Sequence, residues 1–253
     1  MPSIEELYNI SEQSLNKSEK GLLEKAYNFA KKAHGDQKRS SGELYFCHAF
    51  ETAKNLIKLG MDAKTIAAGL LHDVLEDTKV TKEEMEREFG EDIVFLVDGV
   101  TKLGTLKYRG HERHVESLRK FFVAMENDLR VVIIKFDDRL HNLKTLEFLR
   151  EDKRKRIAIE SIEVYASLAN RLGMGKLKGE LEDAAFPYAY PEEYGQIEEI
   201  IKEKRGLYEK YLAEVNEELK KELRKNKIKV NEIDYRIKHK YSLYKKLLRY
   251  DMD

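Results

Sequence analysis

Apolar side chains recur at intervals of three and four residues along most of this chain, the period of helices that bury one face. Residues 19–34 show the pattern clearly, with Leu23, Ala26 and Ala30 on one side and Ser18 as a candidate cap. Gly60 ends a helix that begins after Glu43. The same pattern predicts further helices over residues 4–15, 115–126, 154–172 and 192–226. We therefore expect an all-α fold.

Polar residues mark the ends of several predicted helices. Asp62 is placed to cap the helix that follows it, and residues 81–84 form a capping box that opens a short helix ending at Gly90. Residues 91–103 are a further apolar segment, whereas residues 104–114 are basic and indicate a loop.

One stretch has an ambiguous pattern. Residues 131–134 are Val-Val-Ile-Ile, a β-branched run that propensity alone would assign to a strand. The apolar period continues through Leu140, Leu143 and Leu146, which is too long for a single strand. We therefore predict a helix across this stretch.

The most distinctive stretch is residues 70–78, which place four ionisable side chains within six positions. At about 100° per residue, these side chains would share an arc of about 140° on a continuous helix. The apolar residues Leu70, Leu71, Val74 and Leu75 would occupy the other side. One face could then enter a core while the other carries a site formed by His72, Asp73, Glu76 and Asp77.

Composition limits the possible functions. The 253 residues are enough for one large domain or two small ones, and Lys+Arg balance Asp+Glu at 47 each. The zero net charge gives no reason to expect nucleic-acid or membrane partners. Cys47 is the only cysteine, which excludes an intrachain disulfide and fits a reducing compartment. The amino terminus does not resemble a secretory signal and no apolar run is long enough to span a bilayer, so we expect a cytoplasmic protein.

Two further residues are candidates to join His72 and Asp73 around a metal ion. His48 lies near the start of a predicted helix, and Asp138 interrupts an otherwise apolar helix. A buried carboxylate is costly unless it is paired or binds a cation, and a hydrolytic metal site needs nitrogen and oxygen ligands from several elements. The alternatives are a structural histidine and an Asp138 that only pairs with a nearby arginine.

Asp138, Asn142 and Thr145 are spaced at i, i+4 and i+7, so they share one face of the predicted helix. Apolar residues occupy the other side. This pattern is typical of a helix that lines a site, although a solvated face would look the same.

Four stretches give the chain a recognisable resemblance. They are residues 26–48, which include His34, Gln37 and Arg39, and residues 69–78, 97–103 and 130–146. In this order they resemble the hydrolase half of the RelA/SpoT family, which makes and degrades guanosine tetra- and pentaphosphate alarmones. That half is an all-helical, metal-dependent phosphohydrolase of the HD superfamily.

The resemblance implies specific roles for residues of this chain. The implied activity is removal of the 3′-pyrophosphate from the guanine nucleotide, which returns GDP or GTP. The implied Mn²⁺ ligands are His48, His72, Asp73 and Asp138, and the residues that would orient and deprotonate the attacking water are Glu76 and Asp77. The implied substrate contacts are Arg39, Ser40, Asn142 and Thr145. Two residues depart from the family pattern: Ser40 stands where a basic residue is frequent, and Asp137 stands where a small residue is usual.

Residues 235–246 resemble the opening of the same family's α/β synthetase domain, although an amphipathic basic segment is the alternative. We expect residues 1–190 to form the HD-type domain with its helical connector. We expect residues 191–253 to form a long charged helix and a truncated start of the synthetase domain, without synthetase activity. Two other functions stay open: an HD-superfamily phosphatase acting on another phosphorylated nucleotide, and a catalytically silent nucleotide-binding module. The complete set of candidate residues argues against the silent module.

Overall fold

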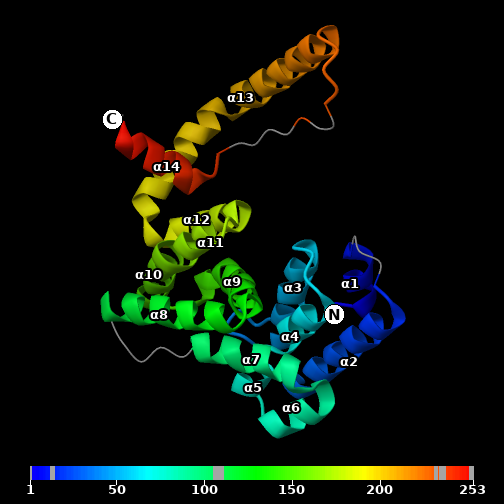
Figure 1. Cartoon of the computed structure of the whole chain (residues 1–253). Helices are drawn as coiled ribbons and strands as arrows, with labels where there is room; N and C mark the ends of the chain where they lie inside the picture. The colour runs from blue at the N-terminus through cyan, green and yellow to red at the C-terminus, as the bar shows by residue number, and fades with distance from the viewer. Residues whose placement is uncertain (1, 12–14, 105–110, 231–232, 234–237, 251–253) are drawn as a thin grey trace.

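The computed structural model describes residues 2–11, 15–104, 111–230, 233 and 238–250, and every regular element in these ranges is a helix (Figure 1). The nearest approach to a sheet in these ranges is an isolated antiparallel bridge between Lys38 and Leu44. The predicted all-α fold is therefore confirmed for the described part of the chain.

Helix α4 (Ala63–Leu71) lies at the centre of the amino-terminal helices, and all of its residues except Lys64 are buried. Helices α2 (Lys17–His34), α3 (Tyr45–Lys58) and α7 (Glu91–Gly104) pack around it. Gly69 allows the close approach of α3, because a Cβ atom at this position would lie 2.4 Å from Leu56 Cδ1. Helix α1 (Ile4–Ile10) packs against α2 and α3 and ends earlier than the predicted residue 15.

Side-chain caps fix the ends of several helices. Asp62 accepts a hydrogen bond from the backbone N–H of Thr65, so it caps α4 as predicted. Thr81 likewise caps α6 (Lys82–Phe89), which ends at Gly90 as predicted. The prediction for α2 was wrong, because the cap is Asn16, whose side chain accepts from the N–H groups of Ser18 and Glu19.

Helix α9 (Leu129–Lys144) confirms the helical interpretation of the β-branched run. Val131, Val132 and Ile134 are all buried against the neighbouring helices, so tertiary packing overrides their strand propensity. A short 3₁₀ turn, η1 (Leu146–Phe148), follows. Helix α8 (His111–Asn127) begins within the predicted loop, and residues 105–110 lie outside the described residues.

The helix predicted over residues 154–172 starts earlier and is not uniform. It consists of α10 (Glu151–Glu160), a π-helical segment η2 (Ser161–Ala166) and α11 (Ser167–Arg171). Helix α12 (Gly175–Ala189) packs across these segments and also contacts α9. It is the helical connector expected from the sequence.

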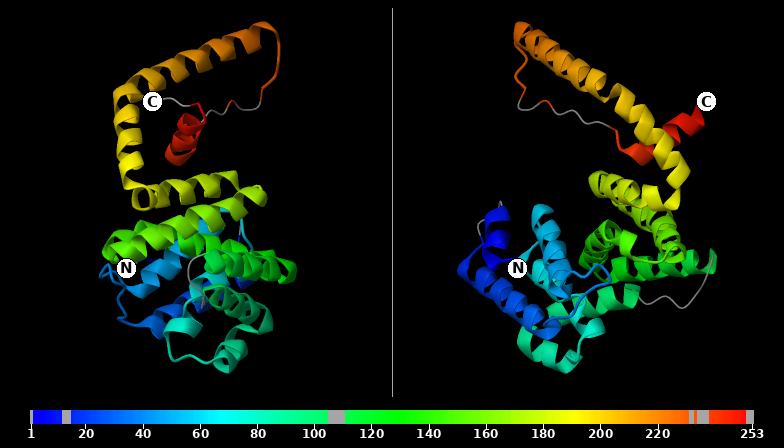
Figure 2. Two further views of the ribbon diagram at one scale, coloured as in Figure 1. Left: turned by 90° about the vertical axis from the view of Figure 1, so that its left-hand side faces the viewer. Right: turned by 180° about the vertical axis from the view of Figure 1, so that it is seen from behind.

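Helix α13 (Pro191–Lys225) confirms the long carboxy-terminal helix, and its far half stands clear of the other helices in both views of Figure 2. Helix α14 (Lys240–Arg249) packs against α12 and the first part of α13. Rings of Phe186, Tyr241 and Tyr244 meet there at centroid distances of 5.2–5.9 Å. The division at residue 190 and the synthetase-like start of the tail stay predictions.

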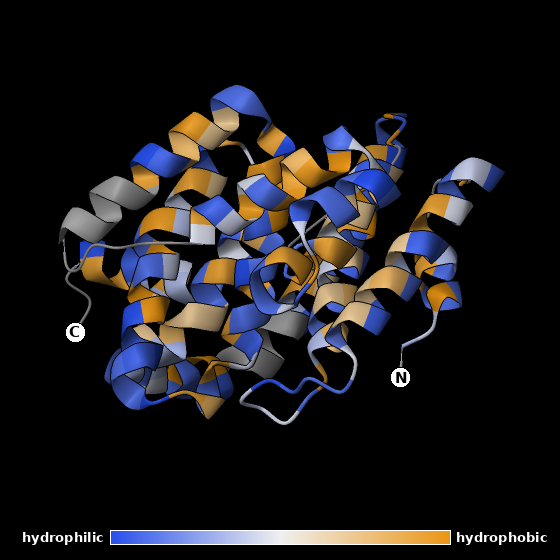
Figure 3. Ribbon diagram, turned by 90° about the horizontal axis from the view of Figure 1, so that it is seen from below, coloured by the Kyte–Doolittle hydropathy of each residue, from blue (hydrophilic) through white to orange (hydrophobic). Residues whose placement is uncertain are grey.

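Hydropathy follows the predicted amphipathic pattern, with apolar and polar residues on different sides of many helices (Figure 3). Helix α4 is the most apolar of the helices that position the candidate site, because it is buried on several sides. In the described part of the chain, none of the helices combines the length and apolar character needed to cross a membrane.

Candidate metal centre

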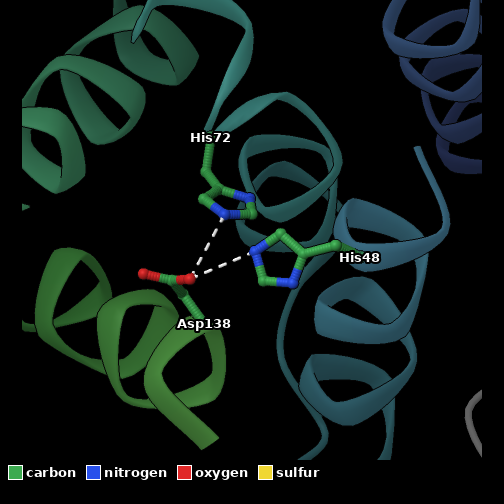
Figure 4. Close-up of side chains that lie close together, drawn as sticks. All are labelled: His48, His72 and Asp138. Atoms are coloured by element: carbon green, nitrogen blue, oxygen red, sulfur yellow. Dashed lines mark hydrogen bonds and ion pairs between the residues drawn. The ribbon is translucent and has the colours of Figure 1, made fainter. Parts of the chain in front are cut away.

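Three predicted ligands come together from separate helices (Figure 4). His48 belongs to the first turn of α3, His72 directly follows α4, and Asp138 lies in α9. The Oδ1 atom of Asp138 lies 3.1 Å from His48 Nε2 and 3.8 Å from His72 Nε2. All three side chains are buried, and one potential ligand atom from each lies within 4.8 Å of the others. This geometry can hold a metal ion.

Asp73 lies beside this group, which we call the metal cluster (His48, His72 and Asp138). Its Oδ1 atom is 3.2 Å from His72 Nε2, and its Oδ2 atom is 3.4 Å from His48 Nε2. Its side chain is 16% exposed, whereas those of the two histidines are at most 1% exposed. Asp73 is therefore on the solvent side of the cluster, where it can reach an ion that the other three hold.

Outward hydrogen bonds orient both imidazole rings. His72 Nδ1 donates to the backbone carbonyl of Gly69 at 2.8 Å, and His48 Nδ1 lies 2.8 Å from His141 Nδ1. The Nε2 atom of each ring then faces the carboxylates. His72 Nε2 is buried and lies 3.2 Å from Asp73 Oδ1 and 3.8 Å from Asp138 Oδ1, but no hydrogen bond of good geometry to it is formed among the described residues. Two nitrogen donors and carboxylate oxygens fit a divalent cation, and ligating histidines commonly use their other nitrogen in this way.

The cluster concentrates negative charge in a buried place. Burial alone would lower the pKa of His72, but the carboxylates of Asp73 and Asp138 outweigh it and raise that pKa to about 10. Burial would raise the pKa of Asp138, but the neighbouring Lys135 ammonium and histidines hold it well below its usual range. The pKa of His48 is lowered, with burial as the main cause. The cluster thus favours a positive charge, whether a proton or a metal ion, between its members.

The helix predicted through residues 70–78 is interrupted at the candidate ligands, so the prediction of one continuous helix was wrong. Helix α4 ends at Leu71 and α5 (Val74–Asp77) is a separate single turn. The His72 ring donates a hydrogen bond to the backbone carbonyl of Gly69. In a continuing helix, that carbonyl would accept from the backbone N–H four residues later instead. The interruption turns His72 and Asp73 toward the same group of atoms.

The structure also separates Asp137 from Asp138. Asp138 belongs to the metal cluster, whereas Asp137 lines a different pocket with Lys144 and Glu180. Burial and the nearby Glu180 charge raise the pKa of Asp137 to about 8, although Lys144 opposes this. Asp137 is therefore not part of the cluster.

Helix α5 carries the two predicted water-activating carboxylates. Burial raises the pKa of Glu76, against the opposing charge of Lys135 and with support from Asp73. Asp77 lies near Tyr45, whose pKa is raised by burial, by Asp73 and by hydrogen bonding to Asp77. Glu76 is thus close enough to Asp73 and Lys135 for their charges to act on it, and Asp77 lies beside Tyr45.

A pocket of about 450 Å³ lies beside Asp138 and contains the predicted substrate contacts Arg39, Ser40, Asn142 and Thr145. Arg39 donates to Asn142 Oδ1, and also to Thr145 Oγ1 at 3.4 Å. Gly42, at a φ of 84°, closes the turn that presents Arg39. The pocket suits a polyanionic ligand because many of its lining side chains are cationic: Lys38, Arg39, Lys135, Arg139, Lys153 and Arg156.

The helices that carry the metal cluster lie within a region that matches a known protein family. The family model described as "HD domain" matches residues 26–175, which include α3, α4 and α9 with the whole metal cluster. The chain belongs to the HD-domain family. The matched range also includes α5 and the pocket around Arg39.

The HD chain is similar to curated RelA/SpoT-type enzymes, which confirms the resemblance seen in the sequence. It is 49% identical over 90% of its length to an Aquifex aeolicus protein named guanosine-3′,5′-bis(diphosphate) 3′-pyrophosphohydrolase. It is 44% identical over 89% of its length to a Streptomyces coelicolor GTP pyrophosphokinase. It is 43% identical over 89% of its length to the bifunctional (p)ppGpp synthase/hydrolase SpoT of Escherichia coli K12. The chain spans only 32%, 26% and 32% of these relatives.

The HD fold is also supported by a solved structure, that of a metazoan SpoT ortholog described as hydrolysing ppGpp. The TM-score is 0.53 at 22% sequence identity, and the match covers 69% of this chain and 97% of the other. At this identity the likeness concerns the fold alone.

Sequence reasoning did not assign roles to two residues of the HD site. His141 contacts His48, and Lys135 Nζ lies 2.6 Å from Asp138 Oδ2. Both are three positions from Asp138 in α9, so they share its face of the helix. That spacing was the available signal. Burial alone would lower the pKa of Lys135, but the Asp138 charge outweighs it and raises that pKa.

Proposed function

We propose that this protein is a Mn²⁺-dependent hydrolase that removes the 3′-pyrophosphate of guanosine 3′,5′-bis(diphosphate) and of the pentaphosphate. The products are pyrophosphate and GDP or GTP. The observation that carries the proposal is the convergence of His48 Nε2, His72 Nε2 and Asp138 Oδ1 next to a cation-lined pocket. The similarity to named alarmone pyrophosphohydrolases supports the choice of substrate.

In this proposal, His48, His72, Asp73 and Asp138 hold the ion. A bound divalent metal lowers the pKa of a coordinated water and polarises the phosphoryl oxygen. Glu76 is suited to take the proton of the attacking water, because partial burial raises the pKa of its carboxyl above the ordinary value. Asp77, from the same turn, orients that water.

The substrate would lie in the pocket lined by Arg39, Asn142 and Thr145. The Arg39 guanidinium, a group with a flat cationic face, lines the pocket and lies 5.8 Å from the centre of the Tyr45 ring. Such a face can stack on a nucleobase or pair with phosphate. We assign the guanosine contacts to Asn142 and Thr145, with Ser40 at the rim.

The reaction balances with one water molecule. The water oxygen bonds to the phosphorus attached to O3′ of the ribose, the bond from that phosphorus to O3′ breaks, and O3′ takes a proton. Lys135, which lines the same pocket and contacts Asp138, is placed to offset negative charge that develops on the phosphoryl group.

Product analysis tests the proposal. Purified protein loaded with Mn²⁺ is incubated with guanosine tetraphosphate, and nucleotides and pyrophosphate are separated by anion-exchange chromatography. Equimolar GDP and pyrophosphate are expected. Release of orthophosphate, or turnover only of another phosphorylated nucleotide, would favour a different HD phosphatase. Binding of the tetraphosphate without turnover would indicate a silent nucleotide-binding module.

A further inference from the structure

Gln37 connects three of the segments that build the HD site. It lies in the loop between α2 and α3, and its side-chain Nε2 donates to the backbone carbonyl of Asp77 at 3.3 Å. Its Oε1 atom accepts from His34 Nδ1 at 3.0 Å. Its own carbonyl accepts from the backbone N–H of Tyr45, the first residue of α3, at 2.9 Å. One side chain thus joins the end of α2 to α5, and its backbone joins the start of α3.

Helix α5 depends on such external bonds. It has four residues, so it is a single turn. The backbone N–H of Asp77 donates to the carbonyl of Asp73 at 2.9 Å, but the last carbonyls of the turn have no partner within it. Thr78 Oγ1 donates to the carbonyl of Val74 at 2.7 Å, and Gln37 satisfies the carbonyl of Asp77. The carbonyl end of this turn, from which the Asp77 side chain projects, is therefore held by residues outside the turn.

His34 holds the Gln37 amide in the orientation that this bond needs. His34 is 4% exposed, and its ring stacks on Tyr45 with centroids 5.3 Å apart and planes 13° apart. The Tyr45 ring meets the edge of the His48 ring at 6.5 Å. Because His34 Nδ1 donates to Gln37 Oε1, the amide Nε2 is directed to Asp77.

We propose that Gln37, oriented by His34, is a positioning residue that places Asp77 opposite the metal cluster. This inference rests on the proposed function, since only that function gives Asp77 a role on the attacking water. Gln37 lies outside the pocket around Arg39 and outside the metal cluster, so it acts through Asp77 and does not touch the substrate.

The variant Gln37→Met tests this, because methionine keeps the length of the side chain and removes both hydrogen bonds. We expect kcat to fall roughly 10–100-fold, as for other residues that orient an active group. KM and the bound Mn²⁺ should change less than about twofold, because the substrate pocket and the ligands are untouched. Loss of Mn²⁺, or a rise in KM at unchanged kcat, would contradict the assignment.

Tyr27→Phe is the matched control. The Tyr27 hydroxyl donates to the backbone carbonyl of Pro2 at 2.8 Å, so this change, like Gln37→Met, removes a side-chain hydrogen bond to a backbone carbonyl. It lies away from the metal cluster and should leave kcat unchanged. A fall in kcat equal to that of Gln37→Met would show a general loss of stability instead.

A double-mutant cycle shows whether Gln37 acts through Asp77. In the Asp77→Asn background, Gln37→Met should lower the single-turnover rate little further, because the group it positions is already inactive. Fully additive losses would overturn the proposal.

Hydrogen–deuterium exchange supplies a readout that does not depend on activity. Amides of residues 74–78 should exchange faster in Gln37→Met than in the wild type or Tyr27→Phe. Unchanged exchange there would refute the positioning of α5. Faster exchange in a protein that hydrolyses no alarmone would leave the positioning intact and refute the proposed function.

Discussion

The Nδ1 atoms of His48 and His141 lie 2.8 Å apart in the buried centre of the site. Arg39 also donates to His141 Nδ1, at 3.3 Å, so this nitrogen is the acceptor of both contacts. Burial and the nearby charges of His48 and Arg39 lower the pKa of His141 to about 3, which keeps its ring neutral. His48 is therefore the donor, and its Nε2 lone pair is left for the metal cluster.

This relationship predicts that His141→Phe weakens Mn²⁺ binding although His141 is not a ligand. The affinity should fall roughly 10–100-fold, because His48 loses the partner that fixes its ring. Isothermal titration calorimetry with Mn²⁺ measures the change. His141→Asn, which retains an acceptor oxygen, is the control and should bind nearly as well as the wild type. Equal affinity in all three proteins would show that His141 does not orient His48.

The variant Asp73→Ala should abolish metal-dependent hydrolysis with little loss of helicity. Asp73 lies in the turn between α4 and α5 and is partly exposed, so its removal leaves the buried helix faces intact. Its carboxylate faces His48 and His72, the two candidate histidine ligands, so an ion bound between them would lose a ligand. Circular dichroism and a turnover assay check the two parts, and wild-type turnover would refute the assignment of Asp73.

The variant Glu76→Gln should retain the metal and lose turnover. Glutamine keeps the size of the side chain but cannot take a proton from water at neutral pH. The expected loss in kcat is about 10²–10⁴-fold, the usual contribution of a general base. Elemental analysis reports the metal content, and loss of Mn²⁺ from this variant would move Glu76 from water activation to ligation.

The raised pKa of Asp137 predicts that the stability of the folded protein falls as pH rises, whereas the lowered pKa of Asp138 predicts no such fall. Its folded-state pKa of about 8 exceeds the ordinary value of 3.8, so the folded state prefers the protonated carboxyl. The protonated Asp137 carboxyl therefore adds to the free energy of unfolding. This stabilisation is fully present below about pH 4 and is lost as pH rises toward 8, at a slope on the order of 1 kcal/mol per pH unit. Asp137→Asn should flatten the slope and raise the unfolding temperature at pH 7.5.

Thermal unfolding between pH 5 and pH 8.5 measures this difference. The Asn variant should retain bound Mn²⁺, because Asp137 lies outside the metal cluster. A variant that loses the metal would restore Asp137 as a ligand candidate. A parallel pH dependence in both proteins would mean that Asp137 ionises freely in the folded state.

The sequence predicted the helices well where apolar residues recur every three or four positions along the whole buried face. The run through Val131 and Ile134 was resolved correctly, because its apolar spacing continued to Leu143. The interruption at His72 was not foreseeable, since it depends on a bond between the His72 ring and the carbonyl of Gly69. Periodicity contains no information on such local competition.

The ligand set was easier to predict than its surroundings. His48, His72 and Asp138 were identified from residue type and motif, and the structure brings them together. The choice between Asp137 and Asp138 rested on motif register, and the structure places Asp138 in the cluster. Gln37 had no signal in the periodicity, because its role arises from a loop that meets α5 in space.

Anomalous scattering at the manganese absorption edge, from crystals grown with Mn²⁺, tests the central claim most directly. We expect one strong peak roughly 2.0–2.3 Å from His48 Nε2, His72 Nε2 and Asp138 Oδ1, with Asp73 completing the protein ligands. A manganese peak beside Asp137 would contradict the account. So would the absence of a manganese peak with Lys135 Nζ still bonded to Asp138.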